Sequence, residues 1–354
     1  MKKFLCLILA IIMVLPLAAC VAPGTPSGTT PSATTPESTP ETPDKPATPS
    51  IDKDLEIKLT VLSGTTGMGM AKLISEKKNG TAALNYNFSV ISDATQIAPA
   101  IISGSTDIAA VPTNLASTLY KKTNGGVYVL ALNTLGVLYL LENGNTVNNI
   151  ADLKGKTVYV PGAGTNPEYI LKYIIEQNGL TVGTENADVI FDYTYSSPDT
   201  LASAVVGGLA SIALLPEPKV TAVKNQNKDI RTALDLTAEW EKKAEKGTLV
   251  QGCIIVRKEF ADAHPNEIAK FLEEYKASVN FVNESPNEAA TLIAEAGIIP
   301  QAPLALKALP NCNITYIDGA QMKTALSAFY NILFNMAPAS IGGAIPDDGL
   351  YYVK

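Results

Sequence analysis

The chain has 354 residues, of which 46% are hydrophobic and 17% charged, and its formal net charge at pH 7 is −7. This acidic balance excludes the basic face that nucleic-acid binding requires. The two arginines, Arg231 and Arg257, are too few for a clamp of several guanidinium groups around a dicarboxylate.

The first 20 residues have the layout of a lipoprotein signal peptide. Lys2 and Lys3 precede an apolar run over residues 4–15, and Leu-Ala-Ala-Cys at residues 17–20 closes it. The run is shorter than the roughly 20 apolar residues of a transmembrane helix. A small-residue cleavage site that ends in cysteine is typical of lipid attachment. We therefore expect residues 1–20 to be a lipoprotein signal peptide that ends in Cys20. Cleavage before Cys20 leaves this cysteine as the new N-terminus and lipid anchor. The alternative is an ordinary signal peptide with an incidental cysteine.

Residues 22–49 are almost entirely Pro, Thr, Ser, Gly and Ala, without any aromatic residue, Leu, Ile or Val. Such a segment cannot bury enough surface to offset its ordering entropy. We expect residues 21–50 to be a disordered, semi-extended tether. The remaining residues, about 300, are enough for two domains of ordinary size.

The folded part begins with alternating strands and helices. Residues 57–61 alternate apolar and polar side chains, which predicts a strand. A Gly-rich turn at residues 63–67 leads into helical spacing from Met70. Further strands are expected at residues 86–90, 107–111, 127–132 and 136–141, with helices near residues 97–102 and 115–121. Thr113 or Asn114 is placed to cap the second of these helices.

A second section starts at Asp152 with the same rhythm. A strand at residues 157–160 runs through a Gly-rich loop into a helix for which Asn166 is the expected N-cap and Gly179 the stop. A strand at residues 189–193, a helix from Ser197 to Gly207 and a strand at residues 212–215 follow, and after a strand at residues 252–256 the chain is helical. Repeated strand-helix units imply mainly parallel sheets, and two such sections imply two lobes.

Ligands of such sheets bind at the carboxyl ends of the strands, where loops enter helices. Free backbone N–H groups and the positive end of the helix dipole suit an anionic or strongly polar group there. The alternative for each loop is a simple turn or cap. The candidate ligand-binding residues are Thr65, Thr66, Gly67, Met68, Thr113, Asn114, Gly164, Thr165, Asn166 and Glu217.

Several single residues have two interpretations. Glu217 lies between two prolines and is a candidate acceptor for a ligand amine or ring N–H, or else a helix-start carboxylate beside the dipole. Trp240 is the one tryptophan, and core packing is favoured over a ligand-stacking lid. Cys253 and Cys312 cannot be paired from sequence and are more often small buried hydrophobes. His264 is isolated, and no G-x-S-x-G, histidine cluster or Cys/His pair is present, so no enzyme, cofactor or metal is expected.

Short phrases in a fixed order carry a family resemblance. They are Gly-Ser-Thr-Asp-Ile-Ala (104–109), Asp-Leu-Lys-Gly-Lys-Thr-Val (152–158), Glu217-Pro218, Val-Arg-Lys-Glu-Phe (256–260) before His264-Pro265, and Ile-Gly-Gly (341–343) before Pro-Asp-Asp (346–348). With these phrases the chain resembles solute-binding lipoproteins of ABC transporters, in the nitrate/sulfonate/taurine group that includes receptors for pyrimidine vitamin precursors. The resemblance runs from about residue 55 to the C-terminus.

The resemblance implies an α/β, type II periplasmic-binding-protein fold. Residues 51–140 and 253–354 would form lobe I and residues 141–252 lobe II, with hinge crossings near residues 139–142 and 251–256. A small polar organic solute would be enclosed between the lobes by hinge closure. A membrane permease is the implied partner, the protein is expected to be an extracytoplasmic monomer, and the candidate loops are expected to line the cleft.

Two other functions share this fold. Solute receptors of TRAP transporters have similar Lys-Gly-Lys and Gly-x-Gly-Thr phrases. Relatives of the fold also include enzymes of thiamine-pyrimidine and menaquinone synthesis, which are cytoplasmic, so a lipoprotein signal argues against them.

Overall fold

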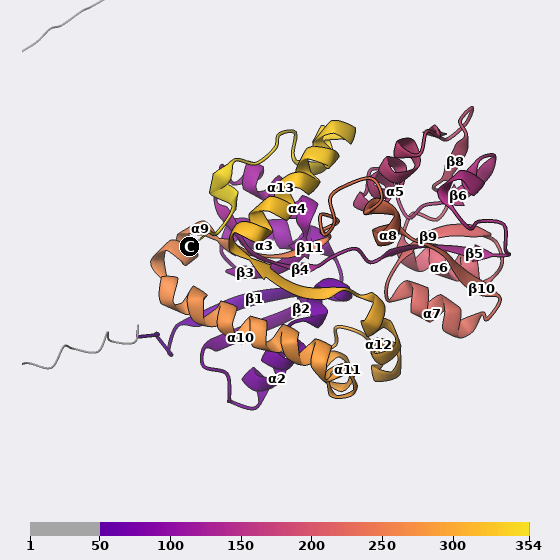
Figure 1. The fold of residues 1–354 in the computed structure, drawn as a ribbon. Coiled ribbons are helices and arrows are strands. Elements are labelled where there is room, and N and C mark those ends of the chain that lie inside the picture. Colours follow the sequence, from indigo (N-terminus) through magenta and orange to yellow (C-terminus); the bar gives the residue numbers. More distant parts are fainter. Residues whose placement is uncertain (1–49, 354) are drawn as a thin grey trace, which may run out of the picture. The chain divides into compact units, whose positions relative to one another are not determined.

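The computed structural model describes residues 50–353, and these residues form two six-stranded sheets flanked by helices (Figure 1). The strand orders are β12-β4-β11-β3-β1-β2 and β10-β5-β9-β6-β8-β7. The first sheet contains β1 (Glu56–Leu62), β2 (Asn85–Ile91), β3 (Ile108–Pro112), β4 (Val127–Thr134), β11 (Gly252–Arg257) and β12 (Ile314–Asp318). The second contains β5 (Leu138–Asn143), β6 (Lys156–Tyr159), β7 (Val182–Gly183), β8 (Val189–Asp192), β9 (Ile212–Pro216) and β10 (Ile230–Asp235).

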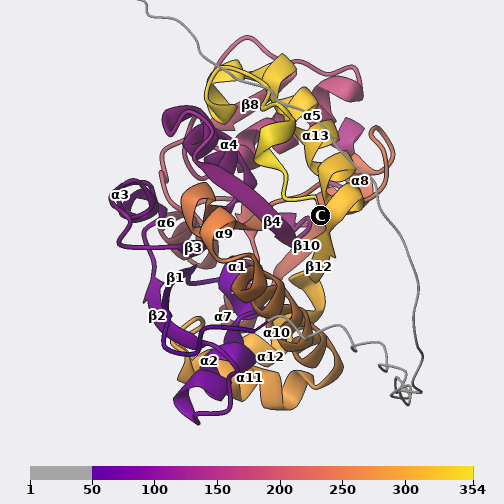
Figure 2. The same cartoon turned by 90° about the vertical axis from the view of Figure 1, so that its left-hand side faces the viewer.

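Helices cover both faces of the first sheet, as the two views in Figures 1 and 2 show. One face packs on α2 (Ala71–Lys78), α9 (Lys258–Ala263), α10 (Pro265–Glu284), α11 (Pro286–Glu295) and α12 (Ala302–Ala308). The opposite face packs on α3 (Ile97–Ser103), α4 (Thr113–Lys122) and α13 (Gly319–Met336). The short helix α1 (Thr65–Met68) follows β1 directly.

The second sheet is covered in the same way. The helices α5 (Asn166–Gln177) and α8 (Leu236–Trp240) pack on one face, and α6 (Pro198–Val206) and α7 (Lys219–Gln226) pack on the other. The α/β class with two sheets is therefore confirmed. Among residues 50–353, no helix is long and apolar enough to span a membrane.

Both sheets are mixed rather than mainly parallel. Strand β1 pairs in parallel with β2 and β3, and in the second sheet β6 pairs in parallel with β8 and β9, and β7 with β8. The strands β11, β4 and β12 pair antiparallel, and so do β5 and β10 with their neighbours. A parallel pair needs a long crossover, usually a helix. Helix α2 lies in the crossover between β1 and β2, and α5 in that between β6 and β8, whereas β4 and β5 lie in different sheets and residues 135–137 join them directly.

The chain crosses between the sheets at residues 135–137 and again at residues 241–251. The two expected crossings are both misplaced, because residues 139–142 lie inside β5 and residues 252–256 lie inside β11. The first crossing could not be located from the sequence, because the residues from Gly136 to Leu141 are apolar both in the passage and in the strand β5 that follows it. Residues 138–140 thus belong to the second sheet; the division into two moving lobes stays a prediction.

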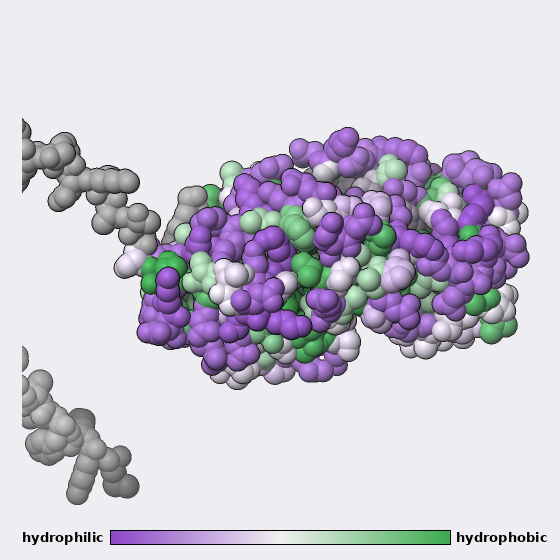
Figure 3. All heavy atoms as spheres, turned by 90° about the horizontal axis from the view of Figure 1, so that it is seen from below, coloured by the Kyte–Doolittle hydropathy of each residue, from purple (hydrophilic) through white to green (hydrophobic). Residues whose placement is uncertain are grey.

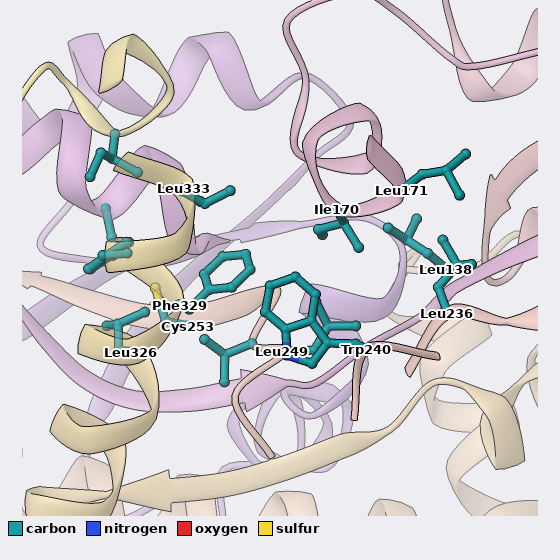
Figure 4. Close-up of a cluster of buried hydrophobic side chains, with 14 of the residues drawn as sticks. Leu138, Ile170, Leu171, Leu236, Trp240, Leu249, Cys253, Leu326, Phe329 and Leu333 are labelled. Carbon is teal, nitrogen blue, oxygen red and sulfur yellow. The ribbon is translucent and has the colours of Figure 1, made fainter. Parts of the chain in front are cut away.

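A buried cluster is shared by the two sheets. Figure 4 shows Trp240 of α8 between Ile170 of α5 and Phe329 of α13. The Trp240 and Phe329 ring centroids are 5.8 Å apart, and the indole N–H donates to Thr248 Oγ1 at 3.0 Å. The preference for a packing role of Trp240 is confirmed.

The two cysteines of the described chain are free thiols inside the protein. Cys253 belongs to the cluster that contains Trp240, and Cys312 lies in the core on the other side of the first sheet. Both are small buried hydrophobes, as isolated cysteines usually are, and the preference against a disulfide is confirmed. Cys20 and the tether at residues 21–50 lie outside the described residues, apart from Ser50.

Candidate functional site

Four of the expected loops lie where a parallel strand ends and a helix starts. The transitions are β1 to α1, β3 to α4, β6 to α5 and β9 to α7. Thr65 and Thr66 are half-buried in α1. Gly67 and Met68 have a packing role instead: a Cβ on Gly67 would lie 2.2 Å from the Leu62 carbonyl oxygen, and Met68 is fully buried in the core. The proposed site therefore does not include these two residues.

Hydrogen bonds connect two of the loops on the first sheet through β4 and residue 251. Asn133 Nδ2 donates to the Thr66 carbonyl oxygen at 2.9 Å. The backbone N–H of Thr113 donates to the Gln251 carbonyl at 3.2 Å, and the Gln251 N–H donates to the Thr134 carbonyl at 2.9 Å. The start of α1 and the start of α4 are thus held to the same short region of backbone, where the chain passes between the sheets.

The same region holds the loop that contains Glu217. Gln251 Oε1 accepts from the Val137 N–H at 2.7 Å, and the Val137 carbonyl accepts from the Glu217 N–H at 2.9 Å. Three loops from two sheets therefore meet around residues 133–137 and 250–251, which we call the crossing region. The hydrogen bond from the Val137 N–H to Gln251 Oε1 joins the two passages between the sheets directly.

Thr113 is a positioning residue of the crossing region. It is fully buried, its hydroxyl donates to the Val250 carbonyl at 2.8 Å, and its own carbonyl accepts from Tyr330 at 2.7 Å. The expectation that Thr113 or Asn114 caps a helix from Leu115 is wrong, because α4 already begins at Thr113 after an extended Pro112. Asn114 is half-buried beside it.

The fourth loop, residues 161–166, is not joined to the other three by a hydrogen bond within residues 50–353. The Thr165 hydroxyl closes its own turn by donating to the Gly162 carbonyl at 2.9 Å, and the Gly164 N–H donates to Glu168. Asn166 is the first residue of α5, so the N-cap position belongs to Thr165, whose backbone is extended. The expectation of Asn166 as N-cap is wrong by one residue.

Asn166 is the most unusual polar residue of the four loops. Its side chain is only 9% exposed, and its Oδ1 has no hydrogen-bond partner in the described structure. A buried acceptor without a donor costs about 1–3 kcal/mol. Such an atom at the start of a twelve-residue helix is suited to receive a donor from outside the chain.

Glu217 acts as a helix-start carboxylate, one of its two interpretations, and its role as a ligand acceptor stays a prediction. Its carboxylate accepts from the Thr221 N–H at 3.1 Å and from the Thr221 hydroxyl at 2.9 Å, so it does act as a helix-start carboxylate. Burial raises its pKa, although the hydrogen bonds from Thr221 and Asn311 and the charge of Lys224 oppose that rise. Glu217 also lines a cavity of about 590 Å³.

That cavity extends from the start of α7 toward α12, and its other polar side chains were not predicted from the sequence. Lys224 and Lys228 are four residues apart, which the sequence displays, but Lys307 is brought to them by the fold alone. Asn133 and Gln251 were also missed, because single amides beside apolar strands carry no pattern. His264 is half-buried against Phe260, and no group of residues suited to a metal ion is found within the described chain.

One family model matches more than half of the chain. The family model described as NMT1/THI5 like matches residues 91–289. A search of curated proteins finds no match.

Solved structures share the fold. An ABC transporter structure from Parabacteroides distasonis has a TM-score of 0.71 at 22% identity, over 85% of this chain and 100% of that one. The periplasmic aliphatic sulphonate binding protein SsuA from Escherichia coli has a TM-score of 0.64 at 16% identity, over 81% of this chain and 95% of that one. A putative periplasmic sulfonate-binding protein from Methylobacillus flagellatus has a TM-score of 0.64 at 15% identity, over 86% of this chain and 93% of that one.

Proposed function

The chain belongs to the NMT1/THI5-like family, and from this premise we propose that it is the extracytoplasmic solute-binding component of an ABC importer. Its solute would be a small polar organic molecule, such as a sulfonate, a small zwitterion or a heterocycle. The fold that it shares with periplasmic sulfonate-binding proteins supports this proposal.

The observation that carries the proposal is the unpaired amide oxygen of Asn166. A binding protein needs acceptors and donors that stay unsatisfied until the ligand arrives, and such atoms are costly elsewhere. Asn166 Oδ1 fits this requirement, because it is buried, lies at a helix start and follows a Gly-rich loop. The proposed contacts are Thr65, Thr66, Asn114, Gly164, Thr165, Asn166 and Glu217, with Thr113 holding its loop in place.

Solute binding by closure requires that the two sheets move relative to each other. The crossing region is the short segment through which both passages run, and its hydrogen bonds connect three of the four loops. Contacts from both sides would favour the closed arrangement by differential affinity. In the proposed function, the loops bind the solute and the crossing region couples the two sheets.

Native mass spectrometry tests the proposal while the solute is still unidentified. The protein lacking residues 1–19, with Cys20→Ser, is dialysed against a small-molecule extract of cells and growth medium. We expect one discrete added mass, which Asn166→Ala loses and Asn178→Ala, at the other end of α5, keeps. An unmodified mass after exposure to extracts from several growth conditions would contradict solute binding.

Membrane attachment is a separate part of the proposal. Cys20 ends a predicted lipoprotein signal, and a single-residue change removes the lipidation site. We expect Cys20→Ala to release the protein into the medium or periplasm, measured by fractionation. A Cys6→Ala control should stay attached, and retention of Cys20→Ala on the membrane would contradict the lipid anchor.

A further inference from the structure

A cavity on the flank of α7 has an unusual charge pattern. It is lined from the second sheet by Tyr139, Glu217, α7 and β10, and from the other side by Lys307 of α12 and Asn311. Three lysines contribute to this wall, namely Lys224, Lys228 and Lys307. Its volume of about 590 Å³ lies within the usual range for small-molecule sites, about 300–1,000 Å³.

None of these three ammonium groups forms an ion pair within residues 50–353. Lys224 Nζ donates to Thr232 Oγ1 at 3.0 Å, Lys228 Nζ to the Lys224 carbonyl at 3.0 Å, and Lys307 Nζ to Asn225 Oδ1 at 3.1 Å. Each positive charge is therefore oriented by a neutral oxygen. By contrast, Lys219 at the start of the same helix pairs with the carboxylate of Asp199.

The one carboxylate among the lining residues, Glu217, interacts with the charge of Lys224 but forms no ion pair with any of the three lysines within residues 50–353. Glu217 is 3% exposed, and its oxygens accept from Thr221 and from Asn311 Nδ2, the latter at 3.5 Å. The wall therefore carries three positive charges against one buried carboxylate, on lysine residues that are exposed to solvent, with the exposed amide of Asn225 beside them. Like charges that share a cavity repel each other unless a counter-ion is present.

We propose that this cavity is a second binding site, and that it takes a phosphate group. Lysine binds phosphate as a point charge, whereas planar carboxylates are better matched by the fork of arginine. Neither arginine of the chain lines the cavity. The lysine ammonium groups, together with the amide and hydroxyl groups of the wall, suit a tetrahedral dianion. The site is separate from the helix-start loops, except that Glu217 lies at its inner end.

The two walls give the site a structural consequence. Lys224 and Lys228 come from the second-sheet side, whereas Lys307 comes from α12, which packs on the first sheet. The Lys307–Asn225 hydrogen bond already joins α12 to α7 across the cavity. A bound phosphate group would add charge-assisted contacts from both walls, and hence would hold α7 and α12 together. On the face seen in Figure 3, hydrophilic residues surround patches of hydrophobic ones.

Isothermal titration calorimetry at constant ionic strength tests the site. The probes are inorganic phosphate and glycerol phosphate, with chloride as the reference. We expect saturable binding of phosphate, at least about tenfold weaker in Lys224→Gln/Lys228→Gln/Lys307→Gln because charge-assisted contacts are lost. The matched control, Lys53→Gln/Lys243→Gln/Lys246→Gln, has the same net charge and should bind like the wild type. Tighter binding of glycerol phosphate than of free phosphate would identify a phosphate ester as the natural source.

Further variants separate this site from the solute site. Lys307→Gln alone should weaken phosphate binding several-fold, because the α12 wall is needed, and Asn166→Ala should leave it unchanged. Equal phosphate affinity of the two triple variants would overturn the proposal, as would an absence of saturable binding to the wild type. Weaker phosphate binding by Asn166→Ala would show that phosphate is bound at the helix-start loops instead. Thermal unfolding without phosphate checks that both triple variants are folded.

Discussion

Asn166 combines burial with an unpaired acceptor, and this combination predicts opposite effects on stability and binding. Removing the amide in Asn166→Ala removes the uncompensated desolvation of Oδ1. We expect the free energy of unfolding to stay the same or to rise by up to about 1–2 kcal/mol. Solute affinity should fall about tenfold or more, as measured by titration calorimetry.

The control for this prediction lies on the same helix. Asn178 follows the last turn of α5 and donates to the Ile174 carbonyl at 2.7 Å, so Asn178→Ala should lower stability and leave affinity unchanged. A loss of stability in Asn166→Ala, with affinity intact, would show that Asn166 is a structural residue.

The raised pKa of Glu217 predicts that stability falls as pH rises through the mildly acidic range. Its pKa in the folded protein is raised, chiefly by burial, so the folded state holds its proton to higher pH than the unfolded state does. The stability that the protonated form contributes is complete below the unfolded pKa and is lost as pH rises through the folded pKa. Glu217→Gln has no proton to lose and can still accept from Thr221.

Urea unfolding of the wild type and Glu217→Gln at several pH values measures this effect. We expect the wild type to lose stability relative to Glu217→Gln as pH rises through the mildly acidic range. A difference between the two proteins that is independent of pH would show that the carboxyl group is solvated as in the unfolded chain.

Strands β5 and β10 are joined by an ion pair between the buried Glu142 and the partly exposed Arg231. Glu142 is 2% exposed and accepts from Arg231 Nη2 at 2.5 Å, from the Thr146 hydroxyl at 2.6 Å and from two backbone N–H groups. Burial raises the pKa of Glu142, but the hydrogen bonds from Thr146, Val147 and Arg231 outweigh burial and leave the pKa lowered.

Arg231→Gln should therefore destabilise the protein at neutral pH. Glu142 keeps its other donors, so we expect a loss of about 1.5–3 kcal/mol, the range for hydrogen bonds to charged groups. Because a lowered carboxylate pKa stabilises above the unfolded pKa, the loss should shrink as pH falls through the folded pKa. Lys154→Gln, which breaks an exposed pair with Asp188, should cost no more than about 1 kcal/mol. Equal losses in chemical unfolding would contradict the buried role of Glu142.

Packing between α5, α8 and α13 depends on Trp240. The indole contacts Tyr173 of α5, with centroids 4.8 Å apart, as well as Phe329 of α13. We expect Trp240→Ala to lower the free energy of unfolding by about 3–5 kcal/mol, and Trp240→Phe by less. A loss below about 1 kcal/mol in urea unfolding would show that the cavity collapses or that the cluster is dispensable.

Elements with strong local signals were predictable. Ser197, Pro198 and Asp199 indicated the start of α6, and the structure has Ser197 as its N-cap with Thr200 in a capping box. Three strands at sheet edges, β7, β10 and β12, were not predicted, whereas the edge strand β2 was predicted at residues 86–90, where Tyr86, Phe88 and Val90 alternate with polar residues. Helix α12 was missed as well, since its seven residues are too few for a clear period.

At the scale of the whole chain, the sequence indicated two sheets but not which strands are neighbours within each sheet. The order of strands in a sheet depends on contacts between distant segments, such as β11 between β3 and β4, and no local pattern encodes them. The four loops were found because each follows a strand and enters a helix. Their linkage through Asn133, Val137 and Gln251 could not be found, since it depends on where residues 135–137 leave the first sheet.

Solute binding by the helix-start loops is tested most directly by thermal unfolding with a panel of solutes. The protein lacking residues 1–19, with Cys20→Ser, is scanned with sulfonates, amino acids, pyrimidines and vitamins. At 100 times its dissociation constant, a ligand of the folded state adds about 2.7 kcal/mol of stability. We predict that one class raises the midpoint of the wild type and of Asn178→Ala but not of Asn166→Ala. An equal rise in Asn166→Ala, or no rise with any solute, would contradict solute binding at these loops.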